Sequence, residues 1–224
     1  MKKIKFVIFD FDGTIANTLP FSFKKFLEIA KLINIENLSD RQIINEIRTK
    51  SYQELLRGSF KQAWLKIPFI ISVIKNMQLE LEKEIHKIKL FPGVKKLLFK
   101  LKKQDFRLAI ISSNIKESID KFIKLNNIDV FDFIHGKTDL FGKAGHLSKF
   151  LKDYNLKQSE VIYIGDEIRD IEACKKVGIE MIGVSWGLHT IDVLKKSGVD
   201  YLVNKPEDIS RILFKHARTT YEVV

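Results

Sequence analysis

Residues 4–14 read Ile-Lys-Phe-Val-Ile-Phe-Asp-Phe-Asp-Gly-Thr, an apolar run that ends abruptly in two carboxylates. Such a run predicts a buried strand, and residues two apart in a strand face the same way. Asp10 and Asp12 should therefore lie close together at a carboxyl strand end, where open α/β sheets bind ligands. Because like charges repel, this pair predicts a metal-assisted site with one attacking carboxylate and one that transfers protons. A plain polar turn is the competing interpretation, since Asp and Gly are common turn residues.

The rest of the chain predicts an α/β protein with a helical insertion. Residues 19–88 have helical apolar spacing and weak strand signals, and Ser39 is placed to cap a helix that ends at Thr49. Further along, short apolar strands alternate with amphipathic helices, which implies a parallel sheet covered on both faces. The predicted strands span residues 107–111, 131–134, 161–164, 180–184 and 201–203. We expect residues 1–16 and 89–224 to form the core and residues 17–88 an all-helical insertion.

Composition restricts the partners and the compartment. The chain has 224 residues and a formal net charge of +11, which favours anionic ligands. Its basic residues are scattered and form no long run, so a phosphorylated metabolite is favoured over nucleic acid. The single cysteine, Cys174, excludes an intramolecular disulfide, fits a reducing compartment and is expected to be buried.

Hydropathy argues against any membrane partner. The apolar run over residues 67–74 is too short to span a bilayer. Asp10 and Asp12 interrupt the first apolar region almost at once, which argues against a secretory signal. We therefore expect a cytoplasmic protein, whose oligomeric state the sequence does not indicate.

Four polar stretches fall where predicted strands end or helices begin. Parallel neighbouring strands bring such positions to one edge of a sheet, so we expect the four stretches to converge. They are Asp10 to Thr14, Ser112-Ser113-Asn114, Lys143 in the loop before a helix that starts at Gly145, and Gly165-Asp166-Glu167 with Asp170.

These stretches together resemble the haloacid dehalogenase superfamily, and specifically its phosphatases. Residues 10–14 match the first motif, Ser112 the second, Lys143 the third, and Gly165-Asp166 with Asp170 the fourth. Phe91-Pro92-Gly93-Val94 and residues 165–178 look like the phosphoglycolate-phosphatase-like branch. The resemblance implies that the core is a Rossmann-like domain and the insertion a cap domain.

The resemblance also implies roles for the acidic residues. Asp10 would attack phosphorus and form an aspartyl-phosphate, and Asp12 would protonate the leaving oxygen and then activate water. Asp10 and Asp166, with Asp12 through its carbonyl group, would bind Mg²⁺ through hard oxygen ligands. Asp12 argues against a carbon–halogen substrate, because dehalogenating relatives lack an equivalent residue.

Further residues are expected to bind the phosphoryl group or to support the site. Asp170 is expected to orient Lys143 or to lie around the metal, and Asn114 is a further supporting residue. The predicted phosphate ligands are Gly13, Ser112, Ser113 and Lys143.

Each of these assignments has a simpler competitor. Ser112 and Asn114 would also serve as helix caps. Lys143 competes with Lys137 and is followed by Ala144, where many relatives have proline. Glu167 matches no strict family position and is either an additional metal-shell acid or an exposed residue.

The sequence thus predicts a Mg²⁺-dependent hydrolase of a small phosphomonoester, with phosphoglycolate as the family-level substrate. Two alternatives stay open: a phosphomutase that uses the same aspartyl-phosphate on a sugar phosphate, and a non-catalytic binding module that kept the fold. Large side chains of the insertion either line a substrate pocket or form its own core. They are Phe21, Phe23, Trp64, Phe69 and Met77.

Overall fold

The core of the molecule is a six-stranded parallel sheet with the strand order β3-β2-β1-β4-β5-β6. The computed structural model describes residues 4–32, 38–58, 67–136 and 142–218. The chain passes from β1 outward to β3 and then returns to β4 beside β1, so the order reverses between β1 and β4. The strands are β1 (Phe6–Phe9), β2 (Arg107–Ile111), β3 (Phe133–His135), β4 (Val161–Gly165), β5 (Glu180–Val184) and β6 (Tyr201–Val203).

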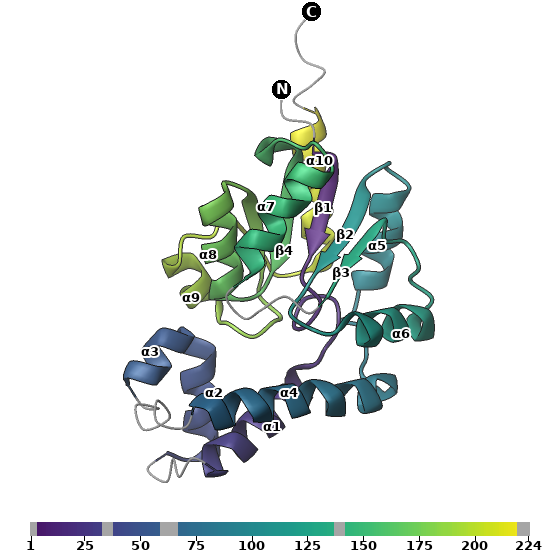
Figure 1. Cartoon of the computed structure of the whole chain (residues 1–224). Coiled ribbons are helices and arrows are strands. Elements are labelled where there is room, and N and C mark those ends of the chain that lie inside the picture. Colours follow the sequence, from purple (N-terminus) through teal and green to yellow (C-terminus); the bar gives the residue numbers. More distant parts are fainter. Residues whose placement is uncertain (1–3, 33–37, 59–66, 137–141, 219–224) are drawn as a thin grey trace, which may run out of the picture.

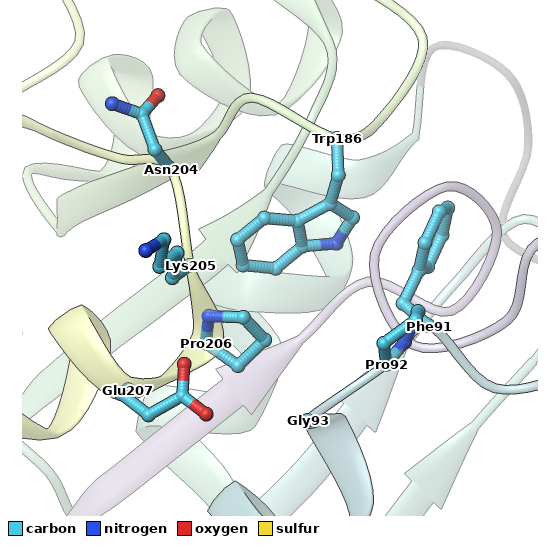
Figure 2. A pocket seen from close by; sticks show the side chains of 8 residues that line it. All are labelled: Phe91, Pro92, Gly93, Trp186, Asn204, Lys205, Pro206 and Glu207. Atoms are coloured by element: carbon cyan, nitrogen blue, oxygen red, sulfur yellow. The ribbon is translucent and has the colours of Figure 1, made fainter.

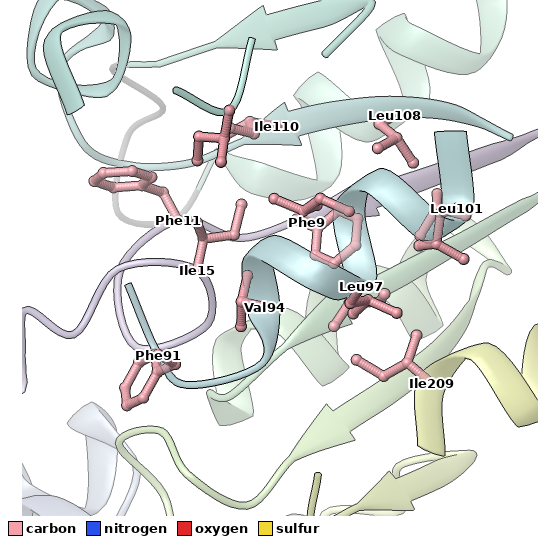
Figure 3. Packing of buried hydrophobic residues seen from close by; sticks show 14 of the residues in the cluster. Phe9, Phe11, Ile15, Phe91, Val94, Leu97, Leu101, Leu108, Ile110 and Ile209 are labelled. Carbon is pink, nitrogen blue, oxygen red and sulfur yellow. The ribbon is translucent and has the colours of Figure 1, made fainter. Parts of the chain in front are cut away.

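Helices cover both faces of this sheet, which confirms the predicted α/β fold. Side chains alternate between the faces: Val7 and Phe9 join one buried cluster with α5, α6 and α10, and Phe6 and Ile8 join another with α7, α8 and α9. Figure 3 shows part of the first cluster around Phe9. The helices are α5 (Val94–Lys102), α6 (Lys116–Asn126), α7 (Lys143–Asp153), α8 (Ile168–Val177), α9 (Ile191–Lys196) and α10 (Pro206–Arg218).

A helical segment connects β1 to β2 and lies beyond the carboxyl ends of the strands (Figure 1). Ser39 caps α2 as predicted, in a capping box with Gln42. Ser51 and Glu54 form a second capping box at the start of α3. The segment comprises α1 (Leu19–Leu32), α2 (Asp40–Thr49), α3 (Tyr52–Arg57), α4 (Ile67–Glu84) and a 3₁₀ turn, Ile85–Lys87.

Several predicted boundaries differ from the structure. The strand predicted at residues 131–134 corresponds to β3, which spans Phe133–His135. In the insertion, residues 67–84 form the single continuous helix α4, because no Gly or Pro interrupts residues 69–84 and Pro68 lies in the first turn. Lys143 is the first residue of α7 and not a loop residue. The last helix begins at Pro206, since proline fits a first turn.

Several predictions about single residues can be compared with the structure. Cys174 is buried, as expected. Phe21 and Phe23 pack partly buried against hydrophobic clusters, which favours a core role for these two. Trp64 and the side chain of Phe69 lie outside the described part of the chain. Among the described helices, none has the length and apolar character needed to cross a bilayer.

Two leucines allow a direct test of the packing. Leu101 is fully buried, whereas Leu125 is 53% exposed on α6. We expect Leu101→Ala to lower the free energy of unfolding by about 2–5 kcal/mol, because it leaves a cavity in the core. Leu125→Ala should change it by less than about 0.5 kcal/mol. Urea denaturation checks both values, and equal effects would contradict the described packing.

Candidate active site

The polar residues that the sequence places at strand ends converge on one edge of the sheet. Phe9 pairs with Ile110 of β2 and with Ile164 of β4, so the residues that follow these strands are neighbours. Asp10 follows β1 directly, and Asp166 follows β4. This edge faces the helical segment in Figure 1.

Three buried carboxylates gather at this edge around one lysine. Carboxylate oxygens of Asp10, Asp166 and Asp170 all lie within 4.8 Å of one another. The Lys143 Nζ lies 2.8 Å from Asp10 Oδ2 and 2.5 Å from Asp170 Oδ1. All four residues are at most 5% exposed. Lys143 thus compensates two of the three carboxylates by direct contact, and Asp166 is left without an ion pair to it.

The protonation equilibria follow from this arrangement. Burial by itself would lower the pKa of Lys143, but the charges of Asp10 and Asp170 override it and raise that pKa. Burial raises the pKa of Asp170 to about 6, with Lys143 acting in the opposite direction. Burial and three neighbouring carboxylates raise the pKa of Asp166 well above its ordinary value. A further positive charge beside Asp166 would therefore favour its ionised form.

Backbone and side-chain donors hold Asp166 in one orientation. The Thr14 hydroxyl donates to Asp166 Oδ1 at 2.8 Å, and the Leu188 backbone N–H donates to Oδ2 at 2.7 Å. A Cβ atom added at Gly13, which has φ +72°, would lie 2.1 Å from Asp166 Oδ2. A Cβ atom at Gly187 would lie 2.1 Å from the Asp166 Cβ. Two glycines therefore give this carboxylate the space that it occupies.

These residues fit a small divalent cation. Mg²⁺ is a hard ion that prefers carboxylate and carbonyl oxygens and usually keeps several waters. The three oxygens are close together, and their repulsion is only partly compensated by Lys143. Asp10 and Asp166 would hold the ion, as predicted from the sequence. Asp170 is the third carboxylate of this group, and its Oδ1 also contacts Lys143.

Asp12 lies next to this group and has a different environment. Its carboxylate is not part of the three-residue cluster and accepts two hydrogen bonds from the Asn114 amide, at 3.1 and 3.2 Å. Burial and the nearby charge of Asp10 raise the pKa of Asp12 to about 7. The expected metal contact through the Asp12 carbonyl group stays a prediction.

The predicted phosphate ligands lie at the same edge, in varied surroundings. Ser112 is fully buried, and its hydroxyl accepts the Asn114 backbone N–H at 3.2 Å. The Ser113 carbonyl group accepts the side-chain amide of Gln78 from α4 at 3.1 Å. The Gly13 N–H donates to the Ala16 carbonyl group at 3.0 Å, so it is already engaged. The structure thus places these serines and Lys143 at the same edge of the sheet, and their binding of phosphate stays a prediction.

The structure bears on Glu167 but not on Lys137, the two residues whose roles the sequence left open. Lys137, the competitor of Lys143, lies outside the described residues. Glu167 is buried and points to Arg169, which donates to it from Nε and Nη2 at 2.7 Å each. Burial would raise the pKa of Glu167, but Arg169 lowers it to about 2. Glu167 is therefore neither exposed nor part of the carboxylate cluster.

Sequence reasoning missed three residues that position Asp166. Thr14 belongs to the first motif but was not assigned a role of its own. Gly187 and Leu188 act through their backbone, which leaves no side-chain signal. The only sequence indication is their place in the loop that follows β5, which ends at Val184, at the same edge of the sheet.

A separate cavity of about 380 Å³ lies beyond the ends of β5 and β6 (Figure 2). It contains none of the predicted site residues. The Trp186 indole N–H in its wall donates to the Thr14 carbonyl group at 3.2 Å, so the cavity borders the carboxylate site. Its lining residues are Phe91, Pro92, Gly93, Trp186, Asn204, Lys205, Pro206 and Glu207.

Comparison with known proteins supports the family resemblance. Residues 7–184 match the family described as haloacid dehalogenase-like hydrolase. A phosphoglycolate phosphatase from Synechococcus elongatus is 28% identical over 91% of this chain and 94% of that protein. A glyceraldehyde 3-phosphate phosphatase from Pyrococcus furiosus is 27% identical over 100% of this chain and 98% of that protein.

Solved structures share the fold. A haloacid dehalogenase-like family hydrolase from Streptococcus pneumoniae superimposes with a TM-score of 0.75 at 22% identity, covering 95% of this chain and 99% of its own. A haloacid dehalogenase-like hydrolase from Bacteroides fragilis gives 0.74 at 24% identity, covering 92% of this chain and 100% of its own. The topology described above is therefore that of known haloacid dehalogenase-like proteins.

The close approach of Gly187 to Asp166 yields a stability test. Gly187→Ala should lower the free energy of unfolding by about 1–3 kcal/mol, because its methyl group overlaps Asp166. Gly145→Ala is the matched control, since a Cβ there meets nothing within 4 Å and lies in the first turn of α7. Alanine favours a helix over glycine by up to about 1 kcal/mol, so this variant should not be destabilised. Urea unfolding that ranks the two variants in the reverse order would contradict the described packing.

Proposed function

Because the chain belongs to the haloacid dehalogenase-like hydrolase family and is a phosphoric monoester hydrolase, we propose how it works. It is a Mg²⁺-dependent phosphatase that hydrolyses a small, phosphoglycolate-like phosphomonoester through an aspartyl-phosphate on Asp10. The observation that carries this proposal is the buried group of Asp10, Asp166 and Asp170 around Lys143.

Asp10 is the nucleophile of the proposal. Its Oδ1 accepts the Phe11 backbone N–H at 2.7 Å and its Oδ2 faces Lys143, so the carboxylate is held in one orientation. A carboxylate oxygen attacks phosphorus, and the bond from phosphorus to the leaving oxygen breaks. A water molecule then attacks phosphorus, the aspartyl-phosphate bond breaks, and Asp10 is restored as a carboxylate.

Asp12 transfers the protons in both steps. It donates a proton to the leaving oxygen and recovers one from the attacking water. A pKa raised to about 7 suits both roles, because acid and base forms are then both populated near neutral pH. The Asn114 amide, 3.1 Å from Asp12 Oδ2, orients this carboxylate as a supporting residue.

Positive charge offsets the repulsion between the carboxylates and an anionic substrate. A Mg²⁺ ion held by Asp10, Asp166 and the Asp12 carbonyl group would supply charge neutralisation and polarise a phosphoryl oxygen. Lys143 binds the transferring phosphoryl oxygens, with Ser112, Ser113 and backbone donors near Gly13 as further ligands. Asp170 orients Lys143 through the contact at 2.5 Å.

The substrate class is argued from size and charge. The relatives are named for phosphoglycolate, for glyceraldehyde 3-phosphate and, at 25% identity over 94% of this chain in Bacillus mycoides, for pyrophosphate. Each of these names denotes a small phosphate compound, and the net charge of +11 favours anions. Residues 17–88 act as a cap over a core of residues 1–16 and 89–224, which shields the site from bulk solvent.

Replacement of Asp10 tests the nucleophile. We expect Asp10→Asn to abolish phosphate release from a panel of small phosphate esters, because an amide does not form the phosphoenzyme. Asp12→Asn should lower the rate about 10²–10⁴-fold. Asp120→Asn, which changes an exposed residue paired with Lys116 on α6, is the control and should retain full activity. Wild-type turnover by Asp10→Asn would refute the assignment.

Removal of the metal tests Asp166. Saturating Mg²⁺ should raise the melting temperature of the wild-type protein, since a ligand that binds only the folded state stabilises it by about 2.7 kcal/mol at 100 times Kd. Asp166→Asn should lose this stabilisation, and a chelator should stop phosphate release until Mg²⁺ is restored. Equal Mg²⁺-dependent shifts in Asp166→Asn and wild type would show that the ion binds elsewhere.

A further inference from the structure

Residues 186–190, which we name the β5–α9 loop, contact Asp166 through backbone groups. The Leu188 N–H donates to Asp166 Oδ2 at 2.7 Å, and the His189 N–H donates to the Asp166 carbonyl group at 3.3 Å. Gly187 packs so closely on Asp166 that a methyl group does not fit between them. The position of Asp166 is therefore tied to the conformation of this loop.

The same loop also contacts the helical segment, at the junction between α2 and α3. The Thr190 N–H donates to the Arg48 carbonyl group at 3.2 Å. His189 Nε2 lies 3.3 Å from the Lys50 carbonyl oxygen. The Leu188 side chain is 6% exposed and is the core's contribution to the buried cluster of the helical segment. The other buried members of that cluster are Ala30, Ile43, Ile47 and Leu55.

His189 connects the two sides of the loop through its ring. Its Nδ1 accepts the backbone N–H of Ile168, the first residue of α8, at 3.4 Å. Because Nδ1 accepts, the proton of the neutral ring lies on Nε2, which then donates to the Lys50 carbonyl group. One imidazole ring thus bridges the start of α8, two residues after Asp166, and the α2–α3 junction.

Arg169 makes a second contact with the same junction. Its guanidinium carbon lies 5.3 Å from the ring centroid of Tyr52, the first residue of α3. Glu167 holds the guanidinium with two hydrogen bonds of 2.7 Å, so the Arg169 side chain is fixed. The α2–α3 junction is therefore seated both on the residues that follow Asp166 and on the loop that holds Asp166.

We propose that the β5–α9 loop couples docking of the helical segment to the position of Asp166, with Leu188 as the positioning residue. The N–H of Leu188 binds the carboxylate, and its side chain lies in the cluster of the helical segment. When the helical segment undocks, the Leu188 side chain moves with it. Because Gly187 packs tightly against Asp166, the loop cannot move independently of Asp166. The inference rests on the proposed function only where it treats Asp166 as a cation ligand.

The coupling is reciprocal, because linkage requires that two equilibria affect each other equally. If docking of the helical segment fixes Asp166 for cation binding, then cation binding at Asp166 stabilises docking by the same factor. Loss of the hydrogen bond between Leu188 and Asp166 should loosen the α2–α3 junction even without metal.

Hydrogen exchange without metal or substrate tests whether loss of the hydrogen bond between Leu188 and Asp166 loosens the α2–α3 junction. Asp166→Ala removes the acceptor of the Leu188 N–H. Asp166→Asn loses the charge but keeps one oxygen that can accept this N–H, and its amide nitrogen can donate to the Thr14 hydroxyl. We expect amide exchange in residues 43–57 to accelerate about five-fold or more in Asp166→Ala and to stay near wild type in Asp166→Asn. Asp10→Ala removes a neighbouring buried carboxylate whose hydrogen bonds are with Phe11 and Lys143, and it should behave like wild type at the junction.

Exchange in α5 distinguishes local from global loosening, because the buried side chains of α5 belong to a different cluster from Leu188 and the α2–α3 junction. Its amides should exchange at the same rate in all variants once global stability, measured in urea, is taken into account. Equal junction exchange in Asp166→Ala and Asp10→Ala would overturn the proposal. The experiment involves no turnover, so it decides the coupling even if the chain proves inactive on phosphate esters.

Calorimetric titration with Mg²⁺ tests the reverse direction. Leu188→Ala keeps the backbone N–H but removes the side chain from the cluster, so it should weaken Mg²⁺ binding about five-fold or more. Leu97→Ala truncates a similarly buried leucine, 4% exposed on α5, and should leave the affinity within about two-fold of wild type. Unchanged Mg²⁺ affinity in Leu188→Ala would overturn the proposal, whereas absence of Mg²⁺ binding in the wild type would instead contradict the proposed function.

Discussion

Repulsion among three buried carboxylates is the constraint on which the rest of the site depends. Asp10, Asp166 and Asp170 have oxygens within 4.8 Å of one another, and Lys143 contacts only the first and the last. In a low-dielectric interior such a group is tolerated only when positive charge is supplied or a proton is retained. The fold supplies one lysine at the first residue of α7. The uncompensated negative charge at Asp166 would favour a cation beside it, and such a cation would also offset the repulsion between the carboxylates and an anionic phosphate group.

The parallel sheet explains how these charges come together from distant parts of the chain. Register between β1 and β4 places Asp10 and Asp166 next to each other at the point where the strand order reverses. Glycines then set the spacing, since a Cβ at either Gly13 or Gly187 would occupy the space of the Asp166 side chain. The geometry of the site therefore depends on the close approach of backbone segments as well as on side-chain chemistry. One of the groups that donate a hydrogen bond to Asp166 is the Leu188 N–H.

The helical segment is integrated with this edge and does not merely cover it. Its buried cluster contains Leu188 from the core, and its α2–α3 junction receives hydrogen bonds from the β5–α9 loop. On the opposite side, Gln78 of α4 donates to the Ser113 carbonyl group. The helical segment thus touches the loops that hold a proposed metal ligand and a proposed phosphate ligand. The position of the helical segment and the geometry of the carboxylates therefore depend on shared contacts, among them those of Leu188.

The sequence by itself determined the α/β class, the helix of the insertion that Ser39 caps and the placement of Asp10, Ser112 and Asp166 at strand ends. These features follow from local patterns: apolar runs, side-chain periodicity and capping residues within a few positions of one another. Only the tertiary structure decided that Lys143 starts α7 between Asp10 and Asp170, and that Leu188 holds Asp166. The second contact joins residues 22 positions apart through a backbone N–H. Every residue except proline carries that group, so no sequence pattern marks it, and only the folded chain selects which N–H meets the carboxylate.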